Sequence, residues 1–279
     1  MGKQPDSNYI LSGDGLKLNY VIRHEEDPQA VVCILHGHGE HKGRYEHVMK
    51  YLNGKSISCM AFDLRGHGLS EGKRGHISSM DQVLNDVEES LKFVRLNYLE
   101  IPIFLFGHSF GGCVTLNYVL KKPILELTGF IASSPWLALA FEPPTWKVKM
   151  GNALSGILPR LTLKSELDTG ALSKDPQVQK AYEEDNLVHN KVSSRFFAET
   201  LNAGSYAIQH ADNVQLNGLI YHGNSDQIID FSATKQFVAN AGSLVEFHEL
   251  DGVFHEPHND IEQNMVFELI SDWILKSVK

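Results

Sequence analysis

The chain has 279 residues, a hydrophobic fraction of 42% and a formal net charge of −9 at pH 7. These values fit a globular protein of one large or two small domains and exclude disordered, collagen-like and coiled-coil classes. An acidic chain repels a phosphate backbone, so we expect no nucleic-acid partner. The 14 histidines stand beside only 3 cysteines, and this excess points to a site that uses imidazole.

The predicted elements begin with a hairpin and continue as an alternation of strands and helices. Tyr9–Leu11 and Leu16–Ile22 flank the turn sequence Ser12–Gly15, which is typical of a hairpin. Short apolar runs then predict buried strands at Ala30–Leu35, Ile57–Phe62, Ile103–Phe106, Thr128–Ala132, Leu219–Tyr221 and Val245–Leu250. Helical spacing of apolar residues predicts helices at Arg44–Leu52, Met80–Leu96, Phe110–Leu120 and Asn264–Val278. This alternation predicts an α/β fold with a mostly parallel central sheet and helices on both faces.

A long interval interrupts this alternation. About 80 residues separate Pro135 from the predicted strand at Leu219, which is too many for one crossover between neighbouring strands. We therefore predict an inserted helical cap over residues 136–214, while residues 1–135 and 215–279 form the sheet domain. The helical segments of the cap are predicted at Trp146–Leu158, Pro176–Asn186 and Ser193–His210.

The first helical segment of the cap is amphipathic. Its apolar side chains, Trp146 and Met150 among them, alternate with Lys147 and Lys149. Such a helix either docks on the sheet domain through its apolar face or lies on a lipid surface, where basic residues beside an apolar stripe are favourable. A transient contact between the cap and a membrane surface stays open as a hypothesis.

The most informative segment is a predicted strand that ends in a Gly-x-Ser-x-Gly sequence and passes directly into a helix. Gly107 and Gly111 permit the sharp turn and the close packing that leave the Ser109 hydroxyl above the carboxyl ends of the strands. The positive end of the following helix favours negative charge at the same place. We therefore predict that Ser109 is a catalytic nucleophile.

A catalytic serine needs a base and an acid that orients the base, and after this kind of turn they follow in the order Asp, then His. Asp226 stands in the loop after a predicted strand. Asp230 is the alternative acid, but its place before an apolar helical start suits a helix cap better. His255 is favoured as the base because it lies in a short loop after the next strand, and His258 is the second candidate.

The tetrahedral intermediate of acyl transfer requires two hydrogen-bond donors directed at its oxyanion. One is predicted to be the backbone N–H of Phe110, the residue after the nucleophile. The other is predicted to be the backbone N–H of His38, which lies in the glycine-rich loop after the first buried strand.

Five segments in combination resemble the α/β-hydrolase superfamily, and more narrowly its monoacylglycerol lipase and lysophospholipase branch. They are His36–Tyr45, Asp63–Gly72, Gly107–Gly112, Gly223–Asp226 and Gly252–His255. The resemblance implies a Ser–Asp–His triad, a cap over the site and hydrolysis of a glycerolipid acyl ester without a metal or other cofactor. It also implies His255 rather than His258 as the base. Two positions depart from the branch, since His38 replaces a small residue and Phe110 replaces Met or Leu, and both are expected to crowd the mouth of the pocket.

Other functions stay open at this point. The sequence His36–His41 approaches the His-x-His-x-Asp-His metal motif of metallo-β-lactamase-like hydrolases, with Glu40 in place of the Asp. A carboxylesterase for short soluble esters and an acyltransferase share the serine motif, because acyl length and acceptor depend on cap geometry. A binding module that kept the fold and lost the chemistry is the alternative outside enzymes.

Several charged residues near these motifs are predicted to be structural. Asp63, Arg65 and His67 follow a strand and are expected to fasten loops by charge and hydrogen bonds. Arg44 and Tyr45 are expected to open the next helix.

The cysteines and the terminal stretch bear on the compartment. Cys33, Cys59 and Cys113 are widely spaced and lie in or beside apolar runs, so we expect reduced, structural thiols. The polar N-terminal stretch and the short apolar runs predict a cytoplasmic protein, with peripheral membrane contact as a hypothesis. The sequence does not indicate an oligomeric state.

Overall fold

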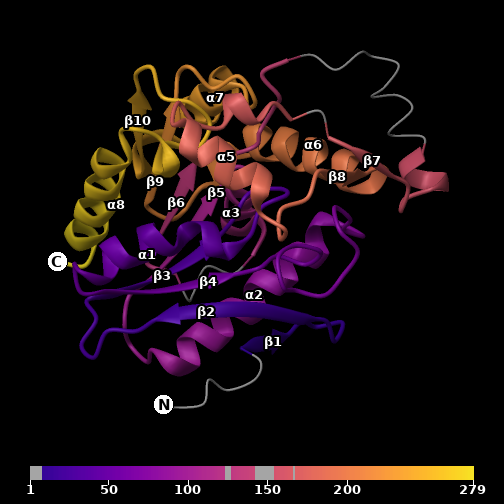
Figure 1. The fold of residues 1–279 in the computed structure, drawn as a ribbon. Coiled ribbons are helices and arrows are strands. Elements are labelled where there is room, and N and C mark those ends of the chain that lie inside the picture. The colour runs from indigo at the N-terminus through magenta and orange to yellow at the C-terminus, as the bar shows by residue number, and fades with distance from the viewer. Residues whose placement is uncertain (1–7, 123–126, 142–153, 166) are drawn as a thin grey trace.

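An eight-stranded sheet forms the centre of the molecule in the computed structural model (Figure 1), which describes residues 8–122, 127–141, 154–165 and 167–279. Its strands are β1 Tyr9–Leu11, β2 Lys17–Arg23, β3 Ala30–Leu35, β4 Ile57–Phe62, β5 Ile103–His108, β6 Gly129–Ser133, β9 Gly218–Gly223 and β10 Val245–Leu250. Their order across the sheet is β1-β2-β4-β3-β5-β6-β9-β10. The pairs β1–β2 and β2–β4 are antiparallel, and every further pair is parallel. The predicted α/β fold with an N-terminal hairpin is confirmed.

The parallel strands bring their carboxyl ends to one edge of the sheet. Strands β3 and β4 are buried along their whole length, because helices cover both faces of a parallel sheet. Strands β5 and β9 extend beyond their apolar runs, since His108 and His222 continue the pairing opposite Ser133 and Glu249. This extension, which hydropathy did not predict, puts two imidazoles at the edge where functional loops begin.

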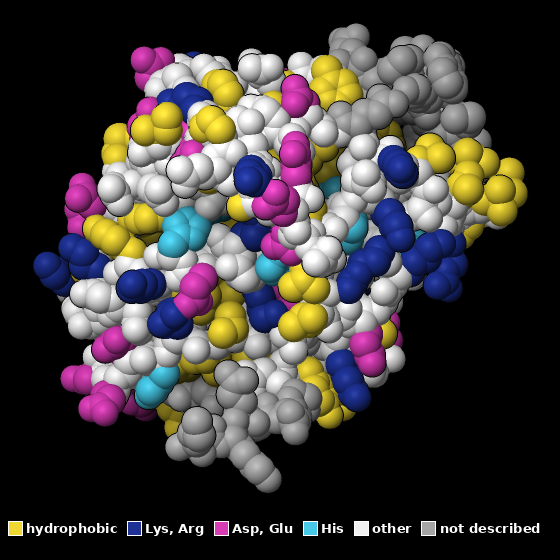
Figure 2. Space-filling model, in the orientation of Figure 1, with side chains coloured by type: hydrophobic (Ala, Val, Ile, Leu, Met, Phe, Trp, Pro, Cys, Tyr) yellow, Lys and Arg dark blue, Asp and Glu magenta, His cyan; other side chains and the backbone are white. Residues whose placement is uncertain are grey.

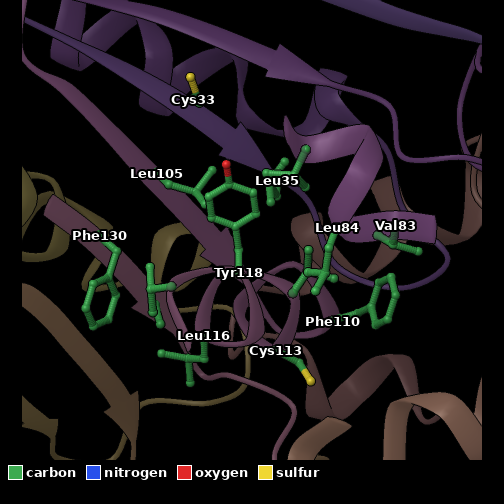
Figure 3. Packing of buried hydrophobic residues seen from close by; sticks show 14 of the residues in the cluster. Cys33, Leu35, Val83, Leu84, Leu105, Phe110, Cys113, Leu116, Tyr118 and Phe130 are labelled. Atoms are coloured by element: carbon green, nitrogen blue, oxygen red, sulfur yellow. The ribbon is translucent and has the colours of Figure 1, made fainter. Parts of the chain in front are cut away.

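Within the described residues, five α-helices belong to the sheet domain. They are α1 Glu46–Asn53, α2 Met80–Asn97, α3 Phe110–Lys121, α7 Phe231–Ala241 and α8 Gln263–Ser277. One hydrophobic cluster joins the sheet to α2, α3 and α7, and a second joins it to α1 and α8. Figure 3 shows part of the first cluster, which contains Leu35 and Leu105 of the strands with Leu84 and Phe110 of the helices. No helix in the described parts of the chain is long and apolar enough to cross a membrane.

Short 3-10 helices connect several of these elements. They are Lys42–Tyr45, Thr169–Ala171, Ala211–Asn213, Gly242–Leu244 and Pro257–Asn259. Arg44 and Tyr45 belong to the first of these turns and do not open α1 as predicted, because α1 begins only at Glu46. The turn starts where a His41 ring nitrogen accepts the Gly43 N–H at 3.1 Å. All three cysteines are buried and unpaired, in agreement with the prediction of structural thiols.

The segment between β6 and β9 holds a separate set of elements. They are β7 Thr162–Lys164, α5 Pro176–Glu184, β8 Lys191–Ser193 and α6 Ser194–Gln209. Helices α5 and α6 agree with two predicted helices and are capped by the side chains of Asp175 and Ser193. Strands β7 and β8 pair antiparallel, and three residues each are too few to predict from alternation. The predicted helix Trp146–Leu158 lies mostly outside the described residues. In the part of it that the structure describes, residues 154–157 are helical.

Helix α6 packs closely on the loop that follows β6. A Cβ at Gly204 would overlap the backbone carbonyl of Leu137, so only glycine allows this approach. Asn117 of α3 holds the same helix, since its Nδ2 donates to the Ala203 carbonyl at 3.1 Å. Because the loop after β6 begins at the carboxyl edge of the sheet, these contacts fix α6 beside that edge.

Candidate active site

Ser109 occupies the turn between β5 and α3 with a strained backbone. Its φ of 52° and ψ of −115° are unusual for a residue that has a Cβ. A side chain at Gly107 would overlap the Gly111 carbonyl, and one at Gly111 would overlap the Leu35 carbonyl. The turn therefore closes only with glycine at both positions. The Ser109 carbonyl also accepts the Trp136 N–H at 2.9 Å, which fastens the strained residue from outside the helix.

The three predicted triad residues come together at the carboxyl edge from three different loops. His255 Nε2 lies 3.0 Å from Ser109 Oγ, and His255 Nδ1 lies 2.7 Å from Asp226 Oδ2. The other oxygen of this carboxylate, Asp226 Oδ1, accepts hydrogen bonds from the backbone N–H groups of Ile228 and Ile229 at 2.8 and 3.0 Å. All three triad residues are buried. The three side chains thus form one chain of hydrogen bonds, which is the arrangement that a nucleophile, a base and an orienting acid require.

The surroundings set the proton affinities of His255 and Asp226. Burial lowers the pKa of His255, but the charge and hydrogen bond of Asp226 outweigh it, so this pKa is raised above its ordinary value. Burial raises the pKa of Asp226, but the charge of His255 and hydrogen bonds from two imidazoles reverse the effect, and this pKa lies far below its usual range. Asp226 is therefore ionised wherever His255 titrates.

The alternative acid and the alternative base occupy other positions. Asp230 caps α7, where its Oδ1 accepts the Ser232 N–H at 2.8 Å. His258 stacks on Tyr45 with ring centroids 4.8 Å apart and lies edge-on to His108. In the part of the chain that the structure describes, neither side chain bonds to the serine hydroxyl, whereas Asp226 and His255 form one chain of hydrogen bonds to it.

The backbone N–H groups of His38 and Phe110 have no hydrogen-bond acceptor in the part of the chain that the structure describes. Phe110 is the first residue of α3, and the first-turn N–H groups of a helix have no partner inside it. Among the described residues, no backbone carbonyl accepts either N–H. A Cβ at Gly37 would lie 3.2 Å from the Ser109 Cβ, so the loop that carries His38 runs next to the nucleophile.

The side chains of His38 and Phe110 meet at Phe196 of α6. Their ring centroids lie 4.4 and 4.6 Å from that of Phe196, and the Trp136 ring lies 6.2 Å from it. Burial, and then the nearby His189, lower the pKa of His38 to about 3, so its ring is neutral at pH 7. The two departures from the lipase branch therefore build an aromatic cluster with Phe196 and Trp136.

The residues of the candidate metal motif are held by separate partners. His36 uses its two ring nitrogens on the Gly37 carbonyl and the Leu64 N–H, at 2.7 and 2.9 Å. His41 Nε2 lies 2.7 Å from an oxygen of Asp185. The described residues contain no group of three or more side chains placed to hold a metal ion. The side chains of this motif therefore point to different parts of the fold.

A family profile accounts for most of the chain. The profile described as serine aminopeptidase, S33, matches residues 26–262. The chain belongs to the serine aminopeptidase S33 family.

Relatives and solved structures agree with the fold and the branch. A monoacylglycerol lipase of Mycolicibacterium smegmatis is 28% identical to the S33-family chain over 264 residues, 94% of each protein. An abhydrolase domain-containing protein of Dictyostelium discoideum is 36% identical over 254 residues, which is 90% of this chain and 27% of that protein's length. The crystal structure of the Paleococcus ferrophilus monoacylglycerol lipase superposes with a TM-score of 0.86 at 30% identity, over 93% of this chain and 99% of that one. The resemblance to this branch of the α/β-hydrolases is confirmed.

A buried ion network joins the loop that carries His38 to the loop that carries His255. Arg44 binds both carboxylate oxygens of Glu256 and one of Glu40, each at 2.7 Å. Glu256 directly follows the triad histidine, and Glu40 accepts the Gly37 N–H at 2.5 Å. Arg44 also lies over the Tyr182 ring of α5, 4.8 Å from its centroid. Sequence reasoning missed this role because Arg44 and Glu256 are 212 residues apart.

Two of the three residues predicted to fasten loops do so. Asp63 accepts the backbone N–H of Lys42 at 2.8 Å and a hydrogen bond from its Nζ at 2.7 Å. Arg65 donates to Asp86 of α2 from two nitrogens at 2.5 and 2.6 Å. His67 instead bonds the Arg65 carbonyl within its own loop through Nδ1.

A second histidine on the triad acid was also missed. His222 Nε2 lies 2.9 Å from the same Asp226 oxygen that bonds His255. The four-residue spacing of His222 and Asp226 is visible in the sequence, but spacing across a strand end does not say which way the ring faces.

Replacing Arg44 with alanine is expected to destabilise the S33-family fold by about 3 to 5 kcal/mol, because two buried carboxylates lose their shared cation. Urea denaturation measures the loss. Lys180→Ala is the control, since Lys180 pairs with Glu184 on the exposed face of α5, and its effect is expected to stay within about 0.5 kcal/mol. Equally small changes in both variants would show that the network contributes little.

Proposed function

We propose that the chain is a serine hydrolase that cleaves acyl esters of glycerolipids, in the manner of a monoacylglycerol lipase or lysophospholipase. The observation that carries the proposal is the hydrogen-bond chain from Ser109 Oγ through His255 to Asp226, at 3.0 and 2.7 Å. Similarity to the monoacylglycerol lipases of Mycolicibacterium smegmatis and Paleococcus ferrophilus supports the substrate class. Each step below uses only residues of the chain and water.

The triad carries the proton transfers. His255 takes the proton from Ser109 as the hydroxyl attacks the ester carbonyl, and ionised Asp226 stabilises the imidazolium that results. His255 then gives this proton to the leaving alcohol, and an acyl ester remains on Ser109. Water, deprotonated by the same imidazole, attacks the acyl carbonyl. The bond from the acyl group to Ser109 Oγ then breaks, the fatty acid leaves, and His255 returns the proton to the serine oxygen.

The backbone N–H groups of His38 and Phe110 form the oxyanion hole in this proposal. Negative charge develops on the carbonyl oxygen in the tetrahedral intermediate, and donors that the fold already holds need no rearrangement to meet it. The amino end of α3 places the positive end of the helix dipole at the same point. The ion network around Arg44 supports the loop that carries His38, because Glu40 bonds the Gly37 N–H.

Residues 136–214 act as the cap over this site. The core consists of residues 1–135 and 215–279. The His189 N–H donates to the Gly39 carbonyl at 2.8 Å, so the cap contacts the loop of the oxyanion donor directly. Phe196 brings an apolar ring against His38. An apolar wall beside the nucleophile suits the acyl part of an ester, while the polar alcohol leaves toward solvent.

Crowding at the nucleophile favours a second candidate, a carboxylesterase for short soluble esters. The Phe196 ring lies 4.4 Å from the His38 ring and 4.6 Å from the Phe110 ring. A long acyl chain on that side of Ser109 requires Phe196 to move, whereas a short one does not.

One edge of the cap combines exposed apolar side chains with lysine and arginine, over β7 and β8 at the right of Figure 2. This cap edge consists of the exposed apolar residues Ile157, Leu158, Leu161 and Leu163 and the exposed basic residues Arg160, Lys164 and Lys191. Exposed Lys73 of the core lies beside it, since its Nζ donates to the Arg160 carbonyl. Lys164 and Lys191 are direct cross-strand partners, and like charges so placed repel each other unless an anion lies nearby. We infer that the cap edge makes transient contact with a membrane surface that carries anionic lipids.

Ser109→Ala is expected to lower monoacylglycerol turnover by about 10⁴-fold or more and to abolish labelling by a fluorophosphonate, because both reactions need Oγ. Ser205→Ala, at an exposed position of α6, is the matched control and is expected to retain both. Turnover that survives in Ser109→Ala, or that a chelator removes from the native protein, would favour the metal-dependent alternative.

Acyl length separates the two candidate functions. For a glycerolipid hydrolase, kcat/KM is expected to rise along a series of monoacylglycerols and p-nitrophenyl esters, by up to about fourfold for each CH₂ that becomes buried. Phe196→Ala is expected to steepen this rise by removing the crowding ring. A sharp optimum at about two to four carbons in the native protein would support the carboxylesterase instead.

The double variant Leu161→Ser, Leu163→Ser is expected to reduce sedimentation with vesicles of phosphatidylcholine and phosphatidylserine several-fold, because each change removes an exposed apolar side chain from the cap edge. The native protein is expected to bind less to pure phosphatidylcholine and less at high salt. Leu96→Ser on α2, where the leucine is 76% exposed, is the control. Equal losses in the control, or no binding of the native protein to either vesicle, would contradict the membrane contact.

A further inference from the structure

The ring of His222 is buried against the triad acid and takes no part in the proton transfers above. Its Nε2 lies 2.9 Å from Asp226 Oδ2, and the same oxygen lies 2.7 Å from His255 Nδ1. The side chains of His222 and Asp226 are both 0% exposed. One carboxylate oxygen therefore bridges two imidazoles at a position shielded from solvent, where each hydrogen bond is strong.

Asp226, with Thr234 of α7 on the other side of the ring, fixes which nitrogen of His222 carries the proton. The Thr234 hydroxyl lies 2.9 Å from His222 Nδ1. Because an ionised carboxylate can only accept hydrogen bonds, His222 Nε2 must donate to Asp226, and Nδ1 then accepts from the hydroxyl. The hydrogen bonds run in one direction, from Thr234 through His222 to Asp226, while His255 donates to the same oxygen from the other side.

The bond from His222 acts on the bond to His255 through the oxygen that they share. Asp226 Oδ1 is held by two backbone N–H groups, and among the described residues Oδ2 is held by the two rings alone. The carboxylate therefore loses one of the two side-chain contacts that orient Oδ2 if His222 is removed. An N–H on Oδ2 also withdraws electron density from it and so weakens its attraction for a protonated His255.

Other titratable groups face His255 and have to be considered in any titration. Besides Asp226, they are Glu40, Glu256, His108 and His258. Burial has the largest effect on the pKa of His255 and lowers it, whereas Asp226 raises this pKa. The two glutamates also raise it, by less than Asp226 does. Burial, and then His255, lower the pKa of His108 to about 3, so this ring is neutral. None of these groups is altered by a substitution at position 222, so a change in the titration of His255 reports on the bond from His222.

We propose that His222 is a positioning residue of the triad, which donates from Nε2 to hold Asp226 Oδ2 in line with His255 Nδ1 and to moderate the bond between them. The inference rests on the proposed serine-hydrolase function, and it assigns a role to a side chain that does not touch the substrate.

The variant His222→Leu removes the donor and keeps a side chain of similar bulk. Its kcat is expected to fall by about tenfold, the effect of one hydrogen bond on the barrier, while KM changes by less than about twofold. The acid limb of the profile of kcat/KM against pH is expected to move to higher pH, because His255 holds its proton more tightly. His222→Gln retains an N–H donor and is expected to restore most of kcat and to return the acid limb toward its native position.

Two further variants test the direction of the network. Thr234→Val removes the hydroxyl that fixes the tautomer and is expected to move the acid limb in the same direction by a smaller amount. His248→Leu changes a partly exposed imidazole on β10 that pairs with Glu246, and it is expected to leave both kcat and the acid limb unchanged.

Thermal unfolding of each variant separates positioning from packing. The proposal would be overturned if His222→Leu lost kcat only in proportion to its loss of stability, if its acid limb did not move, and if His222→Gln did not restore kcat. These results would show that the ring only fills space. Native protein that neither hydrolyses esters nor reacts with a fluorophosphonate would overturn the proposed function, and this role with it. Normal labelling of Ser109 with an unshifted acid limb in every variant would overturn the role of His222 alone.

Discussion

The left-handed backbone of Ser109 is the constraint on which the rest of the site depends. A residue with a Cβ pays about 1 to 3 kcal/mol for such a conformation, and here the close contacts of Gly107 and Gly111 with neighbouring carbonyls leave no other path from β5 into α3. The strained turn lifts the serine hydroxyl clear of the sheet edge. It also starts α3 at Phe110, so the positive end of the helix lies beside Ser109, together with an N–H that no described residue accepts.

Buried charge holds the loops that meet this turn. Arg44 connects Glu40 to Glu256 and so ties the loop after β3 to the loop after β10, while its contact with Tyr182 extends the connection to α5. Removing water from three charges costs free energy that only good geometry offsets. The bidentate pairing of Arg44 with Glu256 supplies that geometry. The relative position of the two loops is therefore held by buried contacts between them and not by the conformation of either loop alone.

Prediction from sequence succeeded where one segment contained the whole pattern. The order of strand, Gly-x-Ser-x-Gly turn and helix lies within a short stretch, and Asp230 was recognisable as a cap because capping involves only its own helix. Prediction failed where partners are distant or where a polar residue continues a strand. Arg44 was assigned to a helix start for the first reason. His222 was left out of β9 for the second, since hydropathy ends the strand at Tyr221 while backbone pairing continues to Gly223.

The sequence by itself determined the alternation of strands and helices and the turn that carries Ser109, because apolar periodicity, turn residues and helix caps act over a few neighbouring positions. Only the tertiary structure decided that His255 and not His258 reaches the serine, and that the rings of His38 and Phe110 meet at Phe196. Those contacts join residues from loops and helices far apart in the chain. Their distances follow from how parallel strands and their covering helices pack, which no local pattern contains.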